Sequence, residues 1–409
     1  MTRYFFLLIG FILALSSFSR AESIPLFTQK YLRTSEKPNL YTATIDNCNP
    51  GATYNLAVIN GQNGEDVISS ASIVLNGVEV VRENEFNQRI ERIEKTVTLQ
   101  PENILNIRLA SGPGGFVTVN IFCSANCPAI EITSPEDLSA VNKSEAIVSG
   151  LLHNASGETG VAITNRDVQV LSQVQGENFS GIVPLQSGSN TIIATAADAC
   201  GLKVKDTVTV NTDTVEEPVG LTVSPSSGVL SATGTFEVTF EAEVYIPNPV
   251  SNYSWDFNGD GVIEREGAGL ATVIASYGQG LYFPAVTVTD TLGNTYTETT
   301  VVNVLSRAEV DTMLKGKWAG MKGELVSGDI NNALGFFLKS SQERYREGLE
   351  VLKSQMGTIF GRPEELLLED VVDGVATYEN IVTEDDGITY SYPVIFILDE
   401  DGLWRIQSF

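Results

Sequence analysis

The chain has 409 residues, and its 51 acidic and 25 basic side chains give a formal net charge of −26. Such an excess of negative charge repels nucleic acids and anionic membrane surfaces, so we expect no nucleic-acid partner. Hydrophobic residues make up 43% of the chain, which is ordinary for a globular protein and argues against general disorder. A chain of this length predicts three or four domains.

The first 21 residues have the pattern of a secretory signal peptide. Arg3 precedes an apolar run from Tyr4 to Leu15, and Ser19-Arg20-Ala21 offers the small residues of a cleavage site. The apolar run is shorter than the ~20 residues that a transmembrane helix needs, and no later segment is long and apolar enough. We therefore expect residues 1–21 to be removed. The mature protein should be secreted, periplasmic or on the cell surface, with no transmembrane segment.

The four cysteines predict disulfide bonds, because the chain is expected to be exported. They are Cys48, Cys123, Cys127 and Cys200, and they allow three pairings. We favour Cys48–Cys123 and Cys127–Cys200, because each pair then brackets one predicted domain. A Cys123–Cys127 bond would close a short loop and would remove less entropy from the unfolded chain. His153 is the single histidine, so a zinc site is not expected.

Residues 22–127 predict a first β-sandwich. Apolar side chains recur at every second position in several short runs, which is the period of half-buried strands. Asn76-Gly77 lies between two such runs and is a strong hairpin signal. The segments 31–34, 73–77 and 86–87 together resemble an N-terminal module of bacterial surface and secreted proteins. That resemblance implies location more than activity.

Residues 128–214 repeat this pattern of short strands and turns. Val204, Val208 and Val210 share one face of the last expected strand. The segment from Pro184 to Asn190 resembles an element of bacterial immunoglobulin-like domains, which implies a second sandwich here. The polar segment that follows, 212–218, predicts a linker.

Residues 218–306 predict a third sandwich. Tyr253, Trp255 and Phe257 alternate as in a half-buried strand. With the stretch from Tyr277 to Tyr282 and the strand from Val286 to Asp290, this segment resembles the polycystic kidney disease (PKD) repeat. That family is an immunoglobulin-like sandwich common in exported bacterial proteins. The sequence departs from the family pattern twice. Asn258 adds a residue to the loop after the tryptophan, and Pro284 stands where a central strand would need an amide donor.

The loop after this strand predicts a calcium site. Asp256, Asn258 and Asp260 offer side-chain oxygens, Val262 its carbonyl, and Glu264 a carboxylate. Alternating oxygen ligands in a tight glycine-containing loop are the arrangement by which a chain surrounds a hard cation. A second interpretation is a turn whose carboxylates bind the loop's own backbone N–H groups. Both interpretations stay open on the sequence.

Beyond residue 306 the pattern changes to helices and then to antiparallel strands. Apolar side chains recur at helical spacing from Val310 to Leu325, and Gly328-Asp329 ends one helix and starts the next. Ser340 to Glu343 has the pattern of a capping box before a further helix. Strands are then expected over 375–382, 390–398 and 403–409.

This order predicts an α+β domain over residues 307–409. It resembles the nuclear-transport-factor-like (SnoaL-like) cone fold, in which a curved sheet wraps a long helix and leaves a pocket. Catalytic members of that family use an aspartate, histidine or tyrosine in the pocket. This domain has no histidine, and nothing specifies a catalytic pair. Its tyrosines are expected in the core and at the rim: Tyr345, Tyr378, Tyr390 and Tyr392.

The expected fold class is mostly β, with tandem immunoglobulin-like β-sandwiches followed by a C-terminal α+β cone-fold domain. We predict no catalytic residues and a non-enzymatic exported protein. Its sandwiches would act as spacer or adhesion modules that bind protein or carbohydrate at the cell surface. Two alternatives stay open: the last domain binds a small ligand or peptide in a pocket, or it catalyses a reaction.

Overall fold

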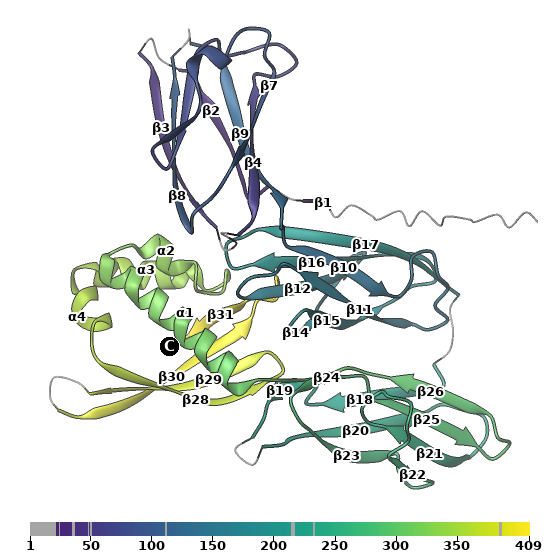
Figure 1. Cartoon of the computed structure of the whole chain (residues 1–409). Coiled ribbons are helices and arrows are strands. Elements are labelled where there is room, and N and C mark those ends of the chain that lie inside the picture. Colours follow the sequence, from purple (N-terminus) through teal and green to yellow (C-terminus); the bar gives the residue numbers. More distant parts are fainter. Residues whose placement is uncertain are drawn as a thin grey trace, which may run out of the picture.

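The structure is a computed structural model that describes residues 22–23, 25–34, 37–47, 49, 51–110, 113–213, 217–231, 234–383 and 387–409. The predicted signal peptide, residues 1–21, and Cys48 lie outside these residues. Strands build several sandwiches and helices occur in the C-terminal region, so the expected mostly β fold class is confirmed (Figure 1). No helix among the described residues is long and apolar enough to cross a bilayer.

The first sandwich packs two four-stranded antiparallel sheets, β2-β9-β4-β7 and β3-β8-β5-β6, around one core. The predicted hairpin at Asn76-Gly77 is confirmed, since β5 pairs with β6 and both turn residues have positive φ, 50° and 79°. The elements are β2 (Phe27–Leu32), β3 (Asn39–Asp46), β4 (Thr53–Asn60), β5 (Ala71–Leu75), β6 (Val78–Val81), η1 (Glu83–Glu85), β7 (Arg92–Val97), β8 (Glu102–Leu109) and β9 (Phe116–Ala125).

The second sandwich includes the first two described residues of the chain in addition to residues 129–212. β1 (Glu22–Ser23) pairs with the edge strand β17, so these two residues extend the second sandwich and not the first. The two sheets have the orders β1-β17-β16-β12-β13 and β10-β11-β15-β14. The strands are β10 (Ala129–Ser134), β11 (Glu145–His153), β12 (Thr159–Asn165), β13 (Val168–Leu171), β14 (Gln173–Gln175), β15 (Asn178–Pro184), β16 (Gly188–Asp198) and β17 (Lys203–Thr212).

The third sandwich encloses an aromatic core around Trp255, which is completely buried and whose indole N–H donates to the Leu270 carbonyl at 2.9 Å. Its sheets are β18-β20-β23 and β22-β21-β25-β26. The strands are β18 (Val219–Ser224), β19 (Ser227–Val229), β20 (Phe236–Val244), β21 (Val250–Asp256), β22 (Arg265–Gly267), β23 (Thr272–Tyr277), β24 (Gly280–Tyr282), β25 (Ala285–Asp290), β26 (Thr295–Thr299) and β27 (Val302–Leu305).

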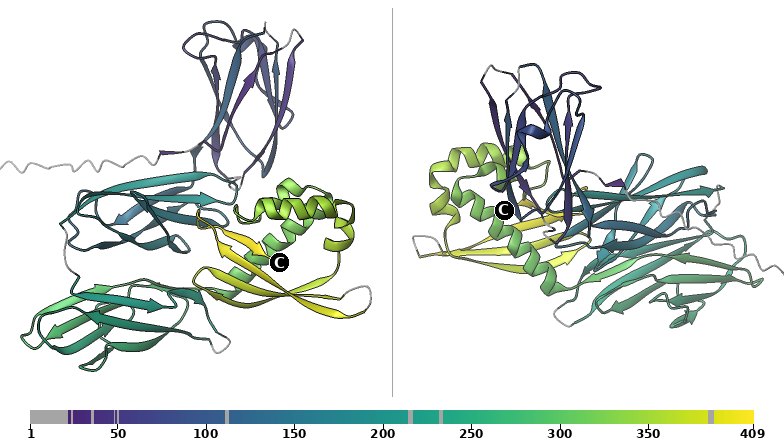
Figure 2. Two further views of the ribbon diagram at one scale, coloured as in Figure 1. Left: turned by 180° about the vertical axis from the view of Figure 1, so that it is seen from behind. Right: turned by 45° about the horizontal axis from the view of Figure 1, so that its top comes forward.

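The C-terminal region lays helices over one face of a curved antiparallel sheet (Figures 1 and 2). Helix α1 buries Leu314, Met321 and Leu325 against that sheet, as their helical spacing predicts. Its elements are α1 (Arg307–Ser327), α2 (Ile330–Leu334), α3 (Gln342–Leu352), η2 (Lys353–Gln355), α4 (Met356–Phe360), β28 (Glu364–Val372), β29 (Val375–Thr383), β30 (Thr389–Leu398) and β31 (Trp404–Ser408).

The helix boundaries test the predicted caps. Gly328 ends α1 at φ 87°, and the Asp329 carboxylate accepts the Asn332 N–H, so the break and restart are confirmed. The capping box predicted from Ser340 to Glu343 is wrong. Helix α3 begins at Gln342 after a turn in which the Leu338 carbonyl accepts the Ser341 N–H, and no side chain caps it.

One sheet runs through the boundary expected between residues 306 and 307. Seven strands follow one another in the order β24-β27-β19-β28-β29-β30-β31, so third-sandwich strands continue into the C-terminal sheet. β19 pairs in parallel with β27 and meets β28 at Gly228↔Val372. The Asp373 carboxylate accepts the N–H groups of Ser226 and Ser227. The third sandwich and the C-terminal region are therefore joined by backbone hydrogen bonds within one continuous sheet.

A buried carboxylate joins the second sandwich to the C-terminal region. The Glu158 carboxylate accepts a hydrogen bond from the backbone N–H of Trp404 at 2.7 Å, and it forms an ion pair with the Lys317 ammonium at 2.5 Å. The side chains of Glu158 and Lys317 are only 9% and 13% exposed. The backbones touch beside them, because a Cβ at Gly160 would lie 2.4 Å from the Asp401 carbonyl oxygen.

The favoured disulfide pairing is wrong. Cys123 bonds to Cys127, with their Cα atoms 5.6 Å apart, so neither the Cys48–Cys123 nor the Cys127–Cys200 bond exists. Cys200 is also disulfide-bonded, and Cys48 lies outside the described residues. The entropy argument failed because it ranks pairings by loop length, whereas the fold brings these two residues together at the end of β9.

We expect the double substitution Cys123→Ala and Cys127→Ala to lower the free energy of unfolding of the first sandwich by about 2 kcal/mol, since a loop this short removes little entropy. Denaturation of the mature chain measures the change. Peptide mapping of the oxidised wild-type chain should yield a fragment with the internal Cys123–Cys127 bond. A Cys48–Cys123 fragment would contradict the structure.

We expect Glu158→Ala to destabilise the junction by about 3–5 kcal/mol, because it leaves the Lys317 charge buried without its partner. The melting temperature of the mature chain measures the effect, as does the rate of limited proteolysis at the surface where the second sandwich contacts the C-terminal region. Glu131→Ala is the matched control, since it removes an exposed carboxylate 3.3 Å from His153 on the same sandwich. Equal melting temperatures for the two variants would show that the ion pair does not hold the junction.

Candidate functional site

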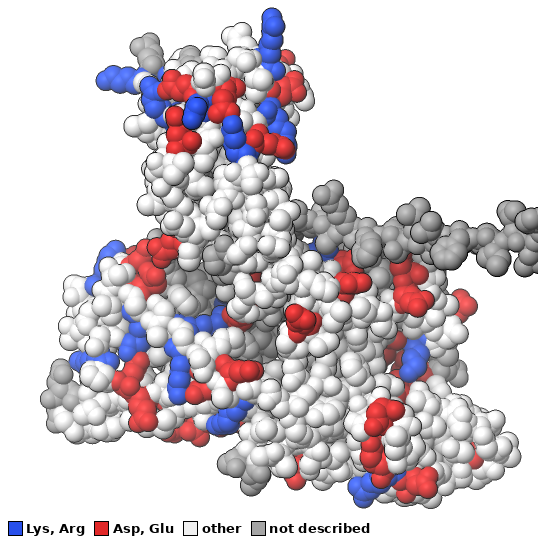
Figure 3. Space-filling view, in the orientation of Figure 1, with Lys and Arg blue, Asp and Glu red and all other residues white. Residues whose placement is uncertain are grey.

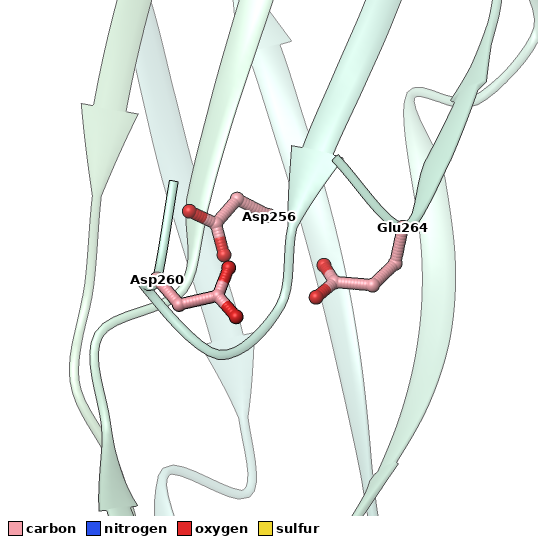
Figure 4. Close-up of side chains that lie close together, drawn as sticks. All are labelled: Asp256, Asp260 and Glu264. Atoms are coloured by element: carbon pink, nitrogen blue, oxygen red, sulfur yellow. The ribbon is translucent and has the colours of Figure 1, made fainter. Parts of the chain in front are cut away.

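The acidic loop of the third sandwich begins where β21 leaves the core. Trp255 anchors the end of this strand, and Asp256 follows it, 7% exposed. The chain then turns through two glycines, Gly259 and Gly261, with φ 80° and 86°. Side chains with a Cβ rarely adopt this left-handed conformation, so the sequence fixes the tight loop. Figure 4 shows the carboxylates of Asp256, Asp260 and Glu264 directed toward one another.

The loop uses these carboxylates as acceptors for its own backbone. The two oxygens of Asp256 accept the N–H groups of Gly259 and Gly261, each at 2.7 Å. Asp260 accepts the Val262 N–H at 2.8 Å, and Glu264 accepts the Phe257 N–H at 2.7 Å. This network is what the turn interpretation predicts, because aspartate carboxylates here replace missing backbone partners.

The same residues also meet the geometric requirement for a cation. Oxygens of Asp256, Asp260 and Glu264 all lie within 4.8 Å of one another. Asn258 adjoins them, with its amide nitrogen donating to Asp260 at 3.1 Å. Val262 is exposed, and the part predicted for its carbonyl stays a prediction. A carboxylate that accepts one N–H keeps further lone pairs for a metal, so calcium in this loop also stays a prediction.

A second aspartate of the predicted PKD-like motif has a structural task. Asp290 is 1% exposed and accepts four hydrogen bonds, from the side chains of Asn248 and Asn294 and the backbone of Leu292 and Asn294. The Asn294 side chain, with these further donors, lowers the pKa of Asp290 to about 2. Asp290 therefore stays ionised and closes the turn after β25.

The space between helices and sheet in the C-terminal region is filled by side chains. Phe337 and Phe396 are completely buried, and Phe409 stacks on Tyr345 with ring centroids 5.3 Å apart. Tyr378 is 1% exposed, and burial raises its pKa above the ordinary value. The core position predicted for Tyr378 is therefore confirmed.

One charged cluster inside this region is also structural in its contacts. The Glu364 carboxylate accepts the Trp318 indole N–H at 2.6 Å and the Asn380 amide at 3.1 Å, and it pairs with Lys322 at 2.5 Å. Each carboxylate oxygen thus has a donor, which makes this group an anchor between α1 and the sheet.

A cleft of about 440 Å³ lies where three bodies meet. Glu158 and Thr159 reach it from the second sandwich, Asn303 from the third, and Val310 and Met313 from helix α1. Sequence patterns did not single out this set, because its members are spread over three predicted domains. No local spacing connects them.

Comparisons with known proteins agree with the sandwich architecture. Residues 128–214, the second sandwich, match the family model for glucodextranase, domain B. No curated protein matches the chain. The match covers the second sandwich alone, and the observed topology gives the class of the whole chain: tandem β-sandwiches of the immunoglobulin-like kind with a C-terminal α+β region. The PKD-like and nuclear-transport-factor-like resemblances remain predictions.

Several solved structures match the chain at low identity and low TM-score. The fibronectin(III)-like modules of Clostridium thermocellum CbhA match at 13% identity, over 44% of this chain and 95% of theirs, with a TM-score of 0.18. The tandem Ig repeats of Drosophila Dlar match at 15% identity, over 44% and 99%, with a TM-score of 0.21. Dimeric latent PorU from Porphyromonas gingivalis matches at 10% identity, over 69% and 34%, with a TM-score of 0.26. We draw nothing from them about what this chain binds.

We expect millimolar calcium to raise the melting temperature of the third sandwich, because three carboxylates this close repel one another without a counter-ion. Differential scanning calorimetry of the mature chain, with calcium and with chelator, measures the shift. The double substitution Asp260→Asn and Glu264→Gln should remove it. Equal melting temperatures of the wild-type chain in calcium and chelator would leave the loop as a self-bonded turn.

Proposed function

We propose that the mature chain is an exported, non-enzymatic binding protein that takes protein or carbohydrate as its partner. In this proposal the three sandwiches form a support, and the C-terminal region completes a recess on it. The predicted signal peptide and the disulfide bond between Cys123 and Cys127 support a location outside the cytoplasm.

The observation that carries this proposal is the fixed junction of three bodies. The third sandwich and the C-terminal region share a seven-stranded sheet, and Glu158 ties the second sandwich to both Lys317 and Trp404. Bodies joined in this way hold the walls of the 440 Å³ cleft at fixed distances. Ligand sites are concave, preformed and frequent at domain interfaces, which favours a binding role for the recess.

The contacts of buried ionisable groups support a role without chemistry. Glu364 and Glu158 each have hydrogen-bond donors that hold elements together, and Tyr378 is packed in the core. A general acid or base must instead be positioned to reach a substrate. In the proposal, the third sandwich is a PKD-like spacer and the C-terminal region is a cone-like fold whose interior serves packing.

Charge on the first sandwich is segregated along its length. In Figure 3, acidic and basic side chains gather at the end farthest from the other bodies, and the half nearest to them shows almost none on this face. Ion pairs of the first sandwich include Lys95–Glu85 and Arg108–Glu83. This end is solvated, so in the proposal the first sandwich extends the support away from the junction.

We expect the mature chain, residues 22–409, to bind saturably to members of an array of extracellular proteins and glycans, without turnover of the bound partner. The recess requires a fixed junction, so Glu158→Ala should weaken this binding while Glu131→Ala should not. Surface plasmon resonance measures both variants. A wild-type chain that binds no member of the array, or that converts one chemically, would contradict the proposed function.

A further inference from the structure

The junction cleft has walls of two kinds. An apolar wall is formed by side chains of helix α1 and its neighbours, among them Leu305, Val310 and Met313. Another part of the lining comes from the second sandwich, around the turn between β14 and β15 that carries Glu177. A ligand that fills this space must therefore place aliphatic atoms against Leu305 and Met313 and polar atoms toward the acidic residues of the lining, Glu177 on the second sandwich and Glu309 on α1.

The charge of the lining is entirely negative. Three glutamates line the cleft, and no lysine, arginine or histidine does. Glu158 is neutralised by Lys317, but the part of the chain that the structure describes places no cation within ion-pair distance of Glu177 or Glu309. The net charge of −26 adds to this local field. The cleft therefore attracts cations and repels phosphate, sulfate and carboxylate ligands.

A buried acceptor without a donor lies in the same cleft. Asn303 is 1% exposed, and its amide nitrogen donates to the Val174 carbonyl at 3.4 Å. Its side-chain oxygen, Oδ1, has no hydrogen-bond donor among the described residues. Leaving such a group unpaired costs about 1–3 kcal/mol, so a ligand N–H that reaches it gains a strong site.

We propose that the cleft binds a lysine or arginine side chain presented by an extended segment of a partner protein. This deepens the proposed function and rests on it, since it names the partner of the same recess. Lysine and arginine carry an aliphatic stem and a cationic head with several N–H donors. The stem packs on Leu305 and Met313, which are half-buried apolar residues of the lining, and the head meets Glu177, Glu309 and the Asn303 oxygen.

The dimensions favour a peptide over a sugar. A volume of about 440 Å³ exceeds one side chain and accommodates the flanking backbone of a partner segment. The aromatic residue of the lining, Trp404, is 6% exposed and offers no open ring face on which a sugar could stack. Gly176 lines the cleft with open space where a side chain would stand, so a partner backbone can approach closely there.

The test uses the mature chain and an array of immobilised octapeptides that vary around a central lysine or arginine. A matched array replaces the central residue by norleucine, which keeps the stem and removes the charge. Peptides that bind are then measured in solution by fluorescence anisotropy. We expect binding to lysine or arginine peptides and its loss, by tenfold or more, with norleucine.

Two pairs of substitutions separate the cleft from the general charge of the molecule. Glu177→Gln with Glu309→Gln removes the two cleft charges, and Glu237→Gln with Glu266→Gln removes two exposed charges elsewhere on the third sandwich. We expect the cleft pair to weaken peptide binding about tenfold and the control pair less than twofold. Met313→Trp should abolish binding by filling the cleft, and melting temperatures should show that all variants are folded.

Equal weakening by the two pairs would overturn the proposal, as would unchanged binding by Met313→Trp or equal binding of the norleucine peptides. Failure to bind any peptide of the array would overturn it as well. The array of extracellular proteins and glycans distinguishes this failure from failure of the proposed function. A partner whose binding survives both Met313→Trp and the cleft pair would sustain the binding role and place it elsewhere on the molecule.

Discussion

The backbone pairing of one three-residue strand is the constraint on which the arrangement of the molecule depends. β19 takes β27 on one side and β28 on the other, so it hydrogen-bonds to the third sandwich and the C-terminal sheet together. Val304 of β27 packs in the core of the sandwich, while Val229 of β19 packs in the core below the helices. Unpaired strand edges are costly, so separation of the two bodies would expose backbone groups and two apolar surfaces at once.

The carboxylates at this junction fall into two kinds, according to whether they have a partner. Glu158 is a buried carboxylate that is tolerated because Lys317 neutralises its charge and the backbone N–H of Trp404 donates to one of its oxygens. Glu177 and Glu309 line the same junction, and none of the residues that the structure describes pairs with them as Lys317 pairs with Glu158. The contrast separates a carboxylate that holds bodies together from carboxylates that remain open to a ligand. Because the junction holds the walls of the cleft in place, a ligand can bind to the open carboxylates without the free-energy cost of ordering those walls.

The residues of the acidic loop fit both a self-bonded turn and a cation-binding loop. Asp256 closes the loop through two N–H groups, and that need alone explains an aspartate there. Asp260 and Glu264 add negative charge on the exposed side, where the loop gains nothing from their proximity to each other. The sequence pattern is therefore the same for a self-bonded turn and for a cation loop, and the two differ only in what balances the charge.

The sequence by itself determined the elements whose signals are local. Helical spacing from Val310 to Leu325, the Asn76-Gly77 turn and the alternation around Trp255 gave the sandwiches, the long helix and the acidic loop, because each depends on residues a few positions apart. Only the tertiary structure decided the Cys123–Cys127 bond, the strand β28 and the shared sheet. β28 escaped prediction because its apolar residues form a run without alternation, and β19 is too short to show a period. The junction cleft depends on side chains brought together from three bodies, and contacts between distant residues leave no spacing in the sequence.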